Sequence, residues 1–240
     1  MSEIFDLHSH VLPAMDDGSK DVDTSLGMLR RMAEMGVTTV CATSHFYAEQ
    51  NDTAAYCRRR SYALEVLRQS IGEDSTLPRI LPAAEVAYFS HMEEHHLERL
   101  CIENTRTLML EMPFSEWTEH QVETVTTLSL DQKFQVVLVH PERFCFSKGN
   151  RSKLERLAKL PIGLQVNAKS LKDWTTRRLT LELLQLTDLP LLGSDCHNLT
   201  TRQPNLKDGR AVIQRKLGAD YLQQMDENAA RVTAPCTAAL

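Results

Sequence analysis

Two histidines separated by one residue, His8 and His10, lie near the start of the chain in the segment DLHSH. Because residues two apart in a β-strand point to the same side, both imidazoles can bind one metal ion. A pair with the same spacing, Asp195 and His197, lies in GSDCH. Either pair alone is a weak signal, since short histidine motifs recur by chance. Together they predict a site of imidazole and carboxylate ligands, which suits divalent zinc, manganese or iron.

Further residues with ligand-type side chains stand at or just after the ends of other short apolar segments. They are His45 in ATSH, Glu85 in PAAE, Glu111 in LMLE, His140 in VLVHPER and Asn167 in LQVN, and Asp17 in DDG is an additional candidate. So many imidazoles and carboxylates exceed what one ion coordinates, and grouped carboxylates repel one another without cations. We therefore expect two or three divalent ions, with the ligands His8, His10, Asp17, His45, Glu85, Glu111, His140, Asp195 and His197.

The elements that must position these ligands alternate along the chain. Short runs rich in Val, Leu and Ile predict strands at 4–8, 37–42, 80–85, 107–112, 135–140, 163–167 and 190–194. Helical spacing is found at 23–35, 53–71, 90–102, 117–131, 151–159 and 173–187, and Gly36 predicts the end of the first helix. This alternation is typical of an α/β fold with a parallel sheet, either open or closed into a barrel. In a parallel barrel, all the predicted ligands would face one mouth.

Length and composition narrow the class of protein. The chain has 240 residues, of which 42% are hydrophobic, and is predicted to form one domain over residues 1–240. Its net charge of −5 disfavours a nucleic acid partner or an anionic membrane surface. No apolar run approaches the length of a membrane span, and the first residues lack the features of a signal peptide. The six cysteines form no CxxC pair, so we expect a reduced, cytoplasmic protein.

Seven segments together resemble a known family. DLHSHVLPAMDDGSKD, GVTTVCATSHF, LPAAEV, LMLEMPF, VLVHPERF, LQVNAKSL and LLGSDCHN are similar, in order, to blocks of the polymerase-and-histidinol-phosphatase (PHP) superfamily. The similarity is closest to the manganese-dependent protein-tyrosine phosphatases of bacterial capsule and exopolysaccharide operons, and it covers roughly residues 4–206. It implies a distorted seven-stranded β/α barrel whose trinuclear site uses the nine ligands named above, with Mn as the favoured metal and Fe or Zn as alternatives.

The resemblance also implies how phosphate is bound and which molecule carries it. Arg143 and Arg202 correspond to the phosphate-binding arginines of the family, and a guanidinium fork matches phosphate oxygens well. A hydroxide shared by two cations is expected to attack phosphorus, and either Asp195 or a metal-bound water would protonate the leaving group. The implied substrate is a phosphotyrosine protein, for which the tail of a capsule-synthesis tyrosine kinase is a candidate. Histidinol phosphate or another small phosphomonoester is the alternative within the same fold.

Three other interpretations remain, and two of them rest on different motifs. Two Cys-x5-Arg matches, Cys145 to Arg151 and Cys196 to Arg202, have the spacing of cysteine-dependent phosphatases, although neither loop is rich in glycine. The segment His91 to His95 matches the HxxEH pattern of zinc peptidases, but a solvated helix explains it better, as it does the remaining histidines, His96 and His120. A metal-binding protein without catalytic activity is the third alternative.

Overall fold

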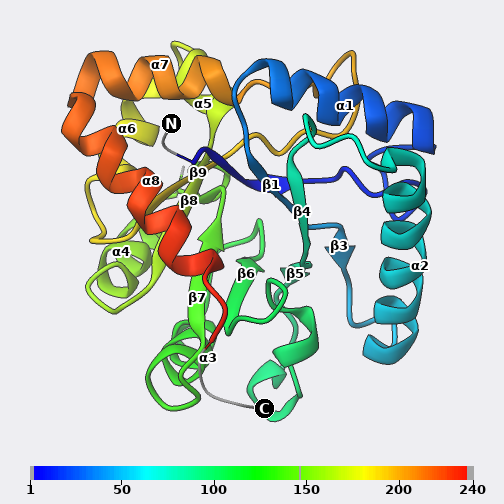
Figure 1. Ribbon diagram of the computed structural model, residues 1–240. Coiled ribbons are helices and arrows are strands. Elements are labelled where there is room, and N and C mark those ends of the chain that lie inside the picture. Colours follow the sequence, from blue (N-terminus) through cyan, green and yellow to red (C-terminus); the bar gives the residue numbers. More distant parts are fainter. Residues whose placement is uncertain (1–2, 146, 237–240) are drawn as a thin grey trace.

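The computed structural model describes residues 3–145 and 147–236 of the chain. Its strands lie in the middle of the molecule and its helices surround them, as Figure 1 shows. The strands are β1 (Phe5–Ser9), β2 (Thr39–Ala42), β3 (His45–Phe46), β4 (Arg79–Pro82), β5 (Glu85–Ala87), β6 (Thr107–Glu111), β7 (Gln135–Val139), β8 (Gly163–Asn167) and β9 (Pro190–Gly193). The helices are α1 (Val22–Glu34), α2 (Thr53–Ile71), α3 (Glu119–Leu130), α4 (Lys148–Leu157), α5 (Ala168–Lys172), α6 (Arg177–Leu184), α7 (Leu206–Leu217) and α8 (Ala219–Thr233).

The strands form two parallel sheets. One has the order β1-β2-β4 and the other the order β3-β5-β6-β7-β8-β9. The strand predicted at 37–42 is found as β2, and the short β3 follows it outside the predicted range. The strand predicted at 80–85 is interrupted and becomes β4 and β5. Backbone bonds join the residues at these breaks: Ala83 N donates to Ala42 O at 2.9 Å and Glu85 N to Thr43 O at 3.1 Å. The prediction of an α/β fold with parallel strands is therefore confirmed.

The end of the first strand also meets the residues that follow the last strand. The amide of Asp195 donates to the carbonyl of His8 at 2.8 Å, and the amide of His10 donates to the carbonyl of Cys196 at 2.9 Å. A parallel bridge joins Ser9 and Cys196. These bonds bring together the two ligand pairs that the sequence separates by more than 180 residues.

The strands form because their residues are apolar on both faces. Val136, Val137, Leu138 and Val139 of β7 are at most 1% exposed, as expected for a parallel strand covered on both sides. Helices supply the outer cover through one apolar face: α1 buries Met28, Leu29 and Met32. Asp21 caps the start of α1 by accepting from the Thr24 amide at 2.8 Å, and Gly36, at φ 84°, follows its end as predicted.

The helical predictions are confirmed in most places and wrong in one. Helix α2 has the predicted bounds, and α1, α3, α4 and α6 overlap their predicted ranges. Residues 90–102 form no α-helix, but two 3-10 turns, η1 (Met92–Glu94) and η2 (Glu98–Leu100). His91 takes a left-handed conformation (φ 60°) that prevents a continuous helix there. Met92, Leu97 and Leu100 are buried, so their apolar spacing imitates a helical face.

Residues after 206, for which the sequence blocks predict no structure, form α7 and α8. Helix α8 packs against β1 and β9 (Figure 1). The carbonyl of its Val232 accepts a hydrogen bond from the Thr107 hydroxyl at 2.6 Å, and Ala229 and Val232 join the apolar cluster of Phe5 and Leu7. This segment therefore completes the core. None of the described helices combines the length and the apolar character needed to span a membrane.

Candidate metal centre

Histidine and carboxylate side chains converge where the parallel strands end. The Nε2 atoms of His8 and His10 are 3.3 Å apart, and each lies 3.3 Å from Oε2 of Glu85. All three side chains are at most 1% exposed. The alternation of β1 points both imidazoles to the same side, as predicted from their spacing. Their three ligand atoms are close enough to one another to hold a single ion.

A second group of ligand atoms lies at the outer side of this cluster. Asp17 Oδ1 is 3.4 Å from Nε2 of His45 and 3.4 Å from Nε2 of His197. His10 belongs to this group as well, since the ring centroids of His10 and His197 are 3.7 Å apart. Asp17 is the most exposed of the predicted ligands, at 64% of its side chain, which places this group at the opening of the site.

A third group centres on Glu85. Its Oε2 lies 2.9 Å from His45 Nδ1, and its Oε1 lies 2.6 Å from His140 Nε2. Glu111 Oε1 is 3.5 Å from the same His140 nitrogen. Ligand atoms of Glu85 therefore take part in two of the groups that could hold a metal ion.

Asp195 lies between this cluster and the two predicted phosphate-binding arginines. Its Oδ1 is 3.5 Å from His10 Nε2 and accepts from Arg202 at 2.7 Å, while Arg143 contacts its Oδ2. Asn167 donates to the same Oδ2 at 2.8 Å. Asp195 adopts the left-handed conformation at φ 52°, which is uncommon for a residue other than glycine and commonly marks a functional site.

Two supporting residues were not predicted from the sequence. Gln165 accepts from His8 Nδ1 at 2.8 Å, and Asp16 accepts from His10 Nδ1 at 2.8 Å. Each bond places the proton on Nδ1 and turns the Nε2 lone pair towards the cluster, as is usual for metal-binding histidines. Asp16 also accepts from the His45 amide at 2.8 Å, so it connects the segment after β1 to the start of β3. The only hint in the sequence is that Asp16 adjoins Asp17.

The charge balance of the cluster favours cations. Burial and the neighbouring Glu85 carboxylate raise the pKa of Glu111 to about 7. Burial opposes the ionisation of Glu85, yet the adjacent His8 and His10 hold the pKa of its carboxyl well below the usual range. Buried atoms of the cluster without a hydrogen-bond partner among the described residues are Glu85 Oε2, His45 Nδ1, His140 Nδ1 and His197 Nε2. Buried imidazole nitrogens and carboxylate oxygens without a hydrogen-bond partner fit divalent metal ions well.

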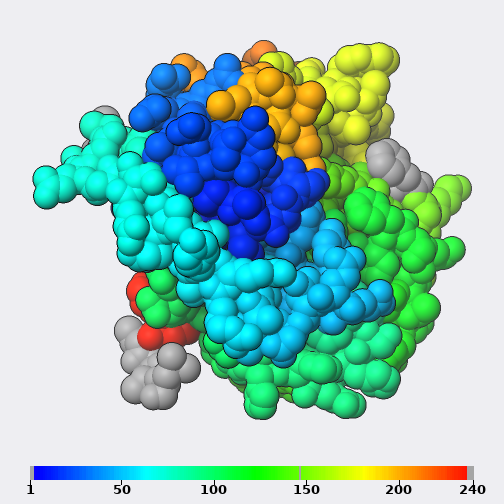
Figure 2. Space-filling view, turned by 90° about the vertical axis from the view of Figure 1, so that its right-hand side faces the viewer, coloured from blue at the N-terminus to red at the C-terminus, as the bar shows by residue number. Residues whose placement is uncertain are grey.

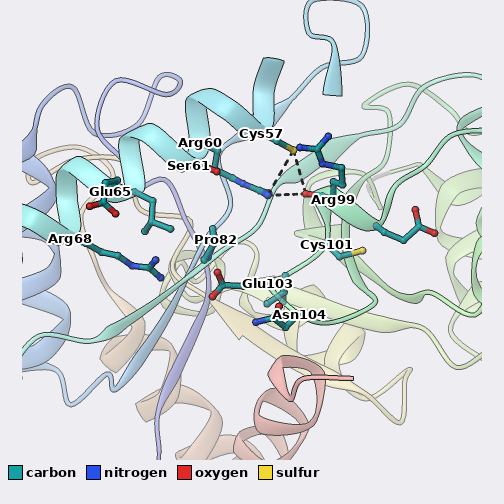
Figure 3. Close-up of a pocket in the computed structure, with 13 residues that line it drawn as sticks. Cys57, Arg60, Ser61, Glu65, Arg68, Pro82, Arg99, Cys101, Glu103 and Asn104 are labelled. Atoms are coloured by element: carbon teal, nitrogen blue, oxygen red, sulfur yellow. Dashed lines mark hydrogen bonds between the residues drawn. The ribbon is translucent and has the colours of Figure 1, made fainter. Parts of the chain in front are cut away.

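The residues of this cluster come from distant parts of the chain, from His8 to His197. On the face shown in Figure 2, blue segments from the first quarter of the chain lie beside green segments from its middle and orange segments from its last quarter. A cleft of about 390 Å³ lies against His45, Glu111 and Arg143. A pocket of about 430 Å³ between α2 and η2, shown in Figure 3, is lined by none of the nine predicted ligands.

Comparison with known proteins agrees with this geometry. A family model described as "Capsular polysaccharide synthesis, CpsB/CapC" matches residues 4–233. The chain belongs to the CpsB/CapC family. The match extends to residue 233, so it is longer than the 4–206 inferred from the sequence blocks and includes the residues of α7 and α8.

Two named relatives and one solved structure are similar to this chain over nearly its whole length. It is 28% identical over 233 residues to the tyrosine-protein phosphatase YwqE of Bacillus subtilis, with 94% of this chain and 90% of the relative covered. It is 22% identical over 236 residues to the tyrosine-protein phosphatase CpsB of Streptococcus pneumoniae, with 92% and 94% covered. A crystal structure from work on YwqE and CpsB, described as unique metal-dependent tyrosine phosphatases, superposes with a TM-score of 0.83 at 25% identity, covering 96% of this chain and 94% of that chain.

The alternative motifs do not form comparable sites in this CpsB/CapC member. Burial raises the pKa of the Cys145 thiol to about 12, and that of Cys196 far above its usual value, so neither is ionised near neutral pH. A protonated thiol is a poor nucleophile. The histidines at 91, 95, 96 and 120 are exposed, as predicted.

Proposed function

We propose that this protein is a metal-dependent phosphomonoester hydrolase that acts on phosphotyrosine proteins in capsule or exopolysaccharide biosynthesis. The observation that carries the proposal is the Glu85 carboxylate, whose oxygens lie within 3.3 Å of nitrogens of His8, His10, His45 and His140. The named relatives, which cover nearly the whole chain, support the same chemistry on phosphotyrosine.

The cluster fits two or three divalent ions, with manganese favoured by the family resemblance. The residues that would hold them are His8, His10, Asp17, His45, Glu85, Glu111, His140, Asp195 and His197. When bound, such ions supply Lewis-acid charge and lower the pKa of a water molecule near phosphorus. Gln165 and Asp16 keep the imidazoles of His8 and His10 in the protonation and orientation that ligation needs.

Arg143 and Arg202 would bind the phosphoryl oxygens. Their side chains are 36% and 32% exposed, so each guanidinium presents donors to solvent while one nitrogen is held by Asp195. The Asp195 carboxylate thereby fixes the direction of both forks before substrate arrives, which favours stabilisation of the charge that develops in the transition state. A phenolate leaving group, with a conjugate pKa of about 10, requires less protonation than an alkoxide.

The fold proposed for this activity is a distorted seven-stranded β/α barrel in a single domain spanning residues 1–240. Counting β2 with β3 and β4 with β5 as interrupted strands gives seven. The hydrogen bonds between residues 8–10, at the end of β1, and residues 195–196, after β9, support a neighbouring position for the first and last strands. A barrel explains why ligands from so many strands gather at one end.

We further infer a cytoplasmic protein whose substrate is a phosphotyrosine protein, with the tail of a capsule-synthesis kinase as the candidate. The net charge of −5 argues against nucleic acid as substrate. The test compares a phosphotyrosine peptide, histidinol phosphate and a small aryl phosphate, each with metal-free enzyme and after addition of Mn²⁺, Fe²⁺ or Zn²⁺. We expect metal-dependent turnover of both aryl substrates. Turnover of histidinol phosphate alone would replace the substrate assignment, and metal-independent turnover would overturn the metal mechanism.

A further inference from the structure

The cleft beside the metal centre is lined by two chemically different sets of side chains. His45, Glu111 and Arg143 are polar or charged, and they connect the cleft to the cluster and to a proposed phosphate-binding arginine. Tyr47, Tyr88 and Phe114 are aromatic. The cleft's volume of about 390 Å³ lies within the range of small-molecule sites. Charged and aromatic side chains in one cleft suit the two parts of an aryl phosphate.

We propose that this cleft binds the aromatic ring of the substrate, with Tyr47 and Phe114 as its walls, and that these two side chains select aryl over alkyl phosphomonoesters. The inference rests on the proposed function and adds to it a ring-binding site and the residues that form it. Aromatic rings pack favourably in offset-stacked and edge-to-face arrangements, and neither wall carries a charge that would repel a phosphate dianion.

Both walls are anchored on histidines of the metal centre. The Tyr47 ring stacks on His45, with centroids 5.3 Å apart and planes 27° apart. The Phe114 ring meets Phe144 edge to face at 5.1 Å, and Phe144 lies 5.5 Å from the His140 ring. A ring held between the walls would therefore stay at a fixed position relative to the cluster, which is the requirement for presenting its phosphate correctly.

The exposure of Phe114 supports a binding role. Its side chain is 65% exposed although it adjoins a cleft that opens on buried charged groups. Large exposed aromatic side chains beside a cleft commonly mark ligand contacts, since a bound apolar group covers them. The pocket in Figure 3 lacks this character: among its lining residues are Arg60, Arg68, Glu65 and Glu103, and no aromatic side chain.

Binding of non-hydrolysable phosphonates to the metal-loaded protein tests the cleft. Phenylphosphonate carries the ring and methylphosphonate does not, so the ratio of their dissociation constants reports the aryl contribution without any turnover. We expect the wild-type protein to prefer phenylphosphonate. Phe114→Ala and Tyr47→Leu should each reduce that preference by about three- to tenfold, the size expected for one aromatic contact, and leave the affinity for inorganic phosphate unchanged.

Matched variants separate a loss of the ring contact from a general effect. Phe114→Trp should keep the preference, because it restores an aromatic wall. Tyr62→Ala, which removes another exposed aromatic side chain (74%) that does not line the cleft, should leave it unchanged. Equal wild-type affinity for the two phosphonates, or a preference untouched by Phe114→Ala and Tyr47→Leu, would overturn the ring site while metal-dependent turnover of aryl phosphates would still uphold the proposed function. A clear preference for phenylphosphonate without turnover of any phosphomonoester would instead uphold the ring site and contradict the proposed function.

Discussion

In the metal centre and in residues 91–96, the His91 segment, histidine nitrogens and carboxylate oxygens lie close together. In the first, atoms of His8, His10 and Glu85 lie within 4.8 Å of one another, and in the second the same holds for His91, Glu93 and Glu94. Their burial differs completely. The three residues of the metal centre are at most 1% exposed, whereas the side chains of His91 and Glu94 are 65% and 73% exposed.

The two regions also differ in what holds their side chains. Gln165 and Asp16 fix the imidazoles of His8 and His10 through bonds of 2.8 Å. His91 forms an exposed ion pair with Glu94 at 3.7 Å, which solvent screens. Short distances between potential ligand atoms are therefore common to both regions. A metal site is distinguished by the burial of these atoms, by hydrogen bonds that orient the side chains, and by ligand atoms that have no hydrogen-bond partner.

Removing a central ligand should have the largest effect. His140→Ala takes away an imidazole whose Nε2 lies 2.6 Å from Glu85, so metal-dependent stabilisation worth several kcal/mol is lost and kcat/KM should fall by at least about a thousandfold. His91→Ala is the matched change in the His91 segment and should leave kcat/KM within about twofold, since it alters a solvated side chain. Steady-state kinetics with an aryl phosphate and metal analysis of both proteins check this. Comparable losses in the two variants would mean that burial does not distinguish the regions.

Metal removal should lower thermal stability through the metal centre alone. If metal is present at about 100 times its dissociation constant, binding contributes about 2.7 kcal/mol, and for a chain of this length chelation should lower Tm by roughly 5–10 °C. The double variant His91→Ala/His95→Ala should show the same decrease, because its metal centre is intact. Differential scanning calorimetry with and without chelator measures the decrease in both proteins. A smaller decrease in the double variant would assign part of the bound metal to the His91 segment.

Changing the residues that orient the imidazoles should produce an intermediate effect. Gln165→Leu and Asp16→Asn keep every ligand but weaken the hold on His8 and His10, so metal affinity should fall by about 10- to 100-fold. Excess metal should restore much of the activity, which a lost ligand would not allow. Glu94→Gln is the control in the His91 segment and should leave metal affinity unchanged. Titration of metal-free protein followed by calorimetry measures this, and unaltered affinity in both variants would contradict the supporting role.

The convergence of these nine residues could be predicted because its signal is local. A polar side chain directly after a buried apolar strand needs only the strand to be recognised, and the period of two in β1 places His8 and His10 together. Parallel strands then bring such ends to one side of the sheet, and the structure places all nine predicted ligands within one cluster.

Other features depend on contacts between distant parts of the chain and could not be predicted from local sequence patterns. Gln165 supports His8 only because β8 lies beside β9, whose end meets β1. The breaks between β2 and β3 and between β4 and β5 involve hydrogen bonds between Thr43 and Ser9 and between residues 42–43 and 83–85, which no local pattern reveals. The buried Met92, Leu97 and Leu100 resemble a helical face, and the left-handed His91 that breaks it is not encoded by a glycine.

The smallest effect on activity is expected from substituting Cys145, the thiol of the first Cys-x5-Arg motif. Cys145 is 6% exposed, and burial raises the pKa of its thiol to about 12. Such a thiol is not a nucleophile near neutral pH, so Cys145→Ser should keep kcat/KM within about twofold and cost about 1 kcal/mol of stability from burying a hydroxyl. Kinetics and denaturant unfolding on the metal-loaded variant check both. Lost turnover with metal content unchanged would favour a thiolate mechanism, and would show that a buried, oriented ligand cluster is insufficient to identify the reacting group.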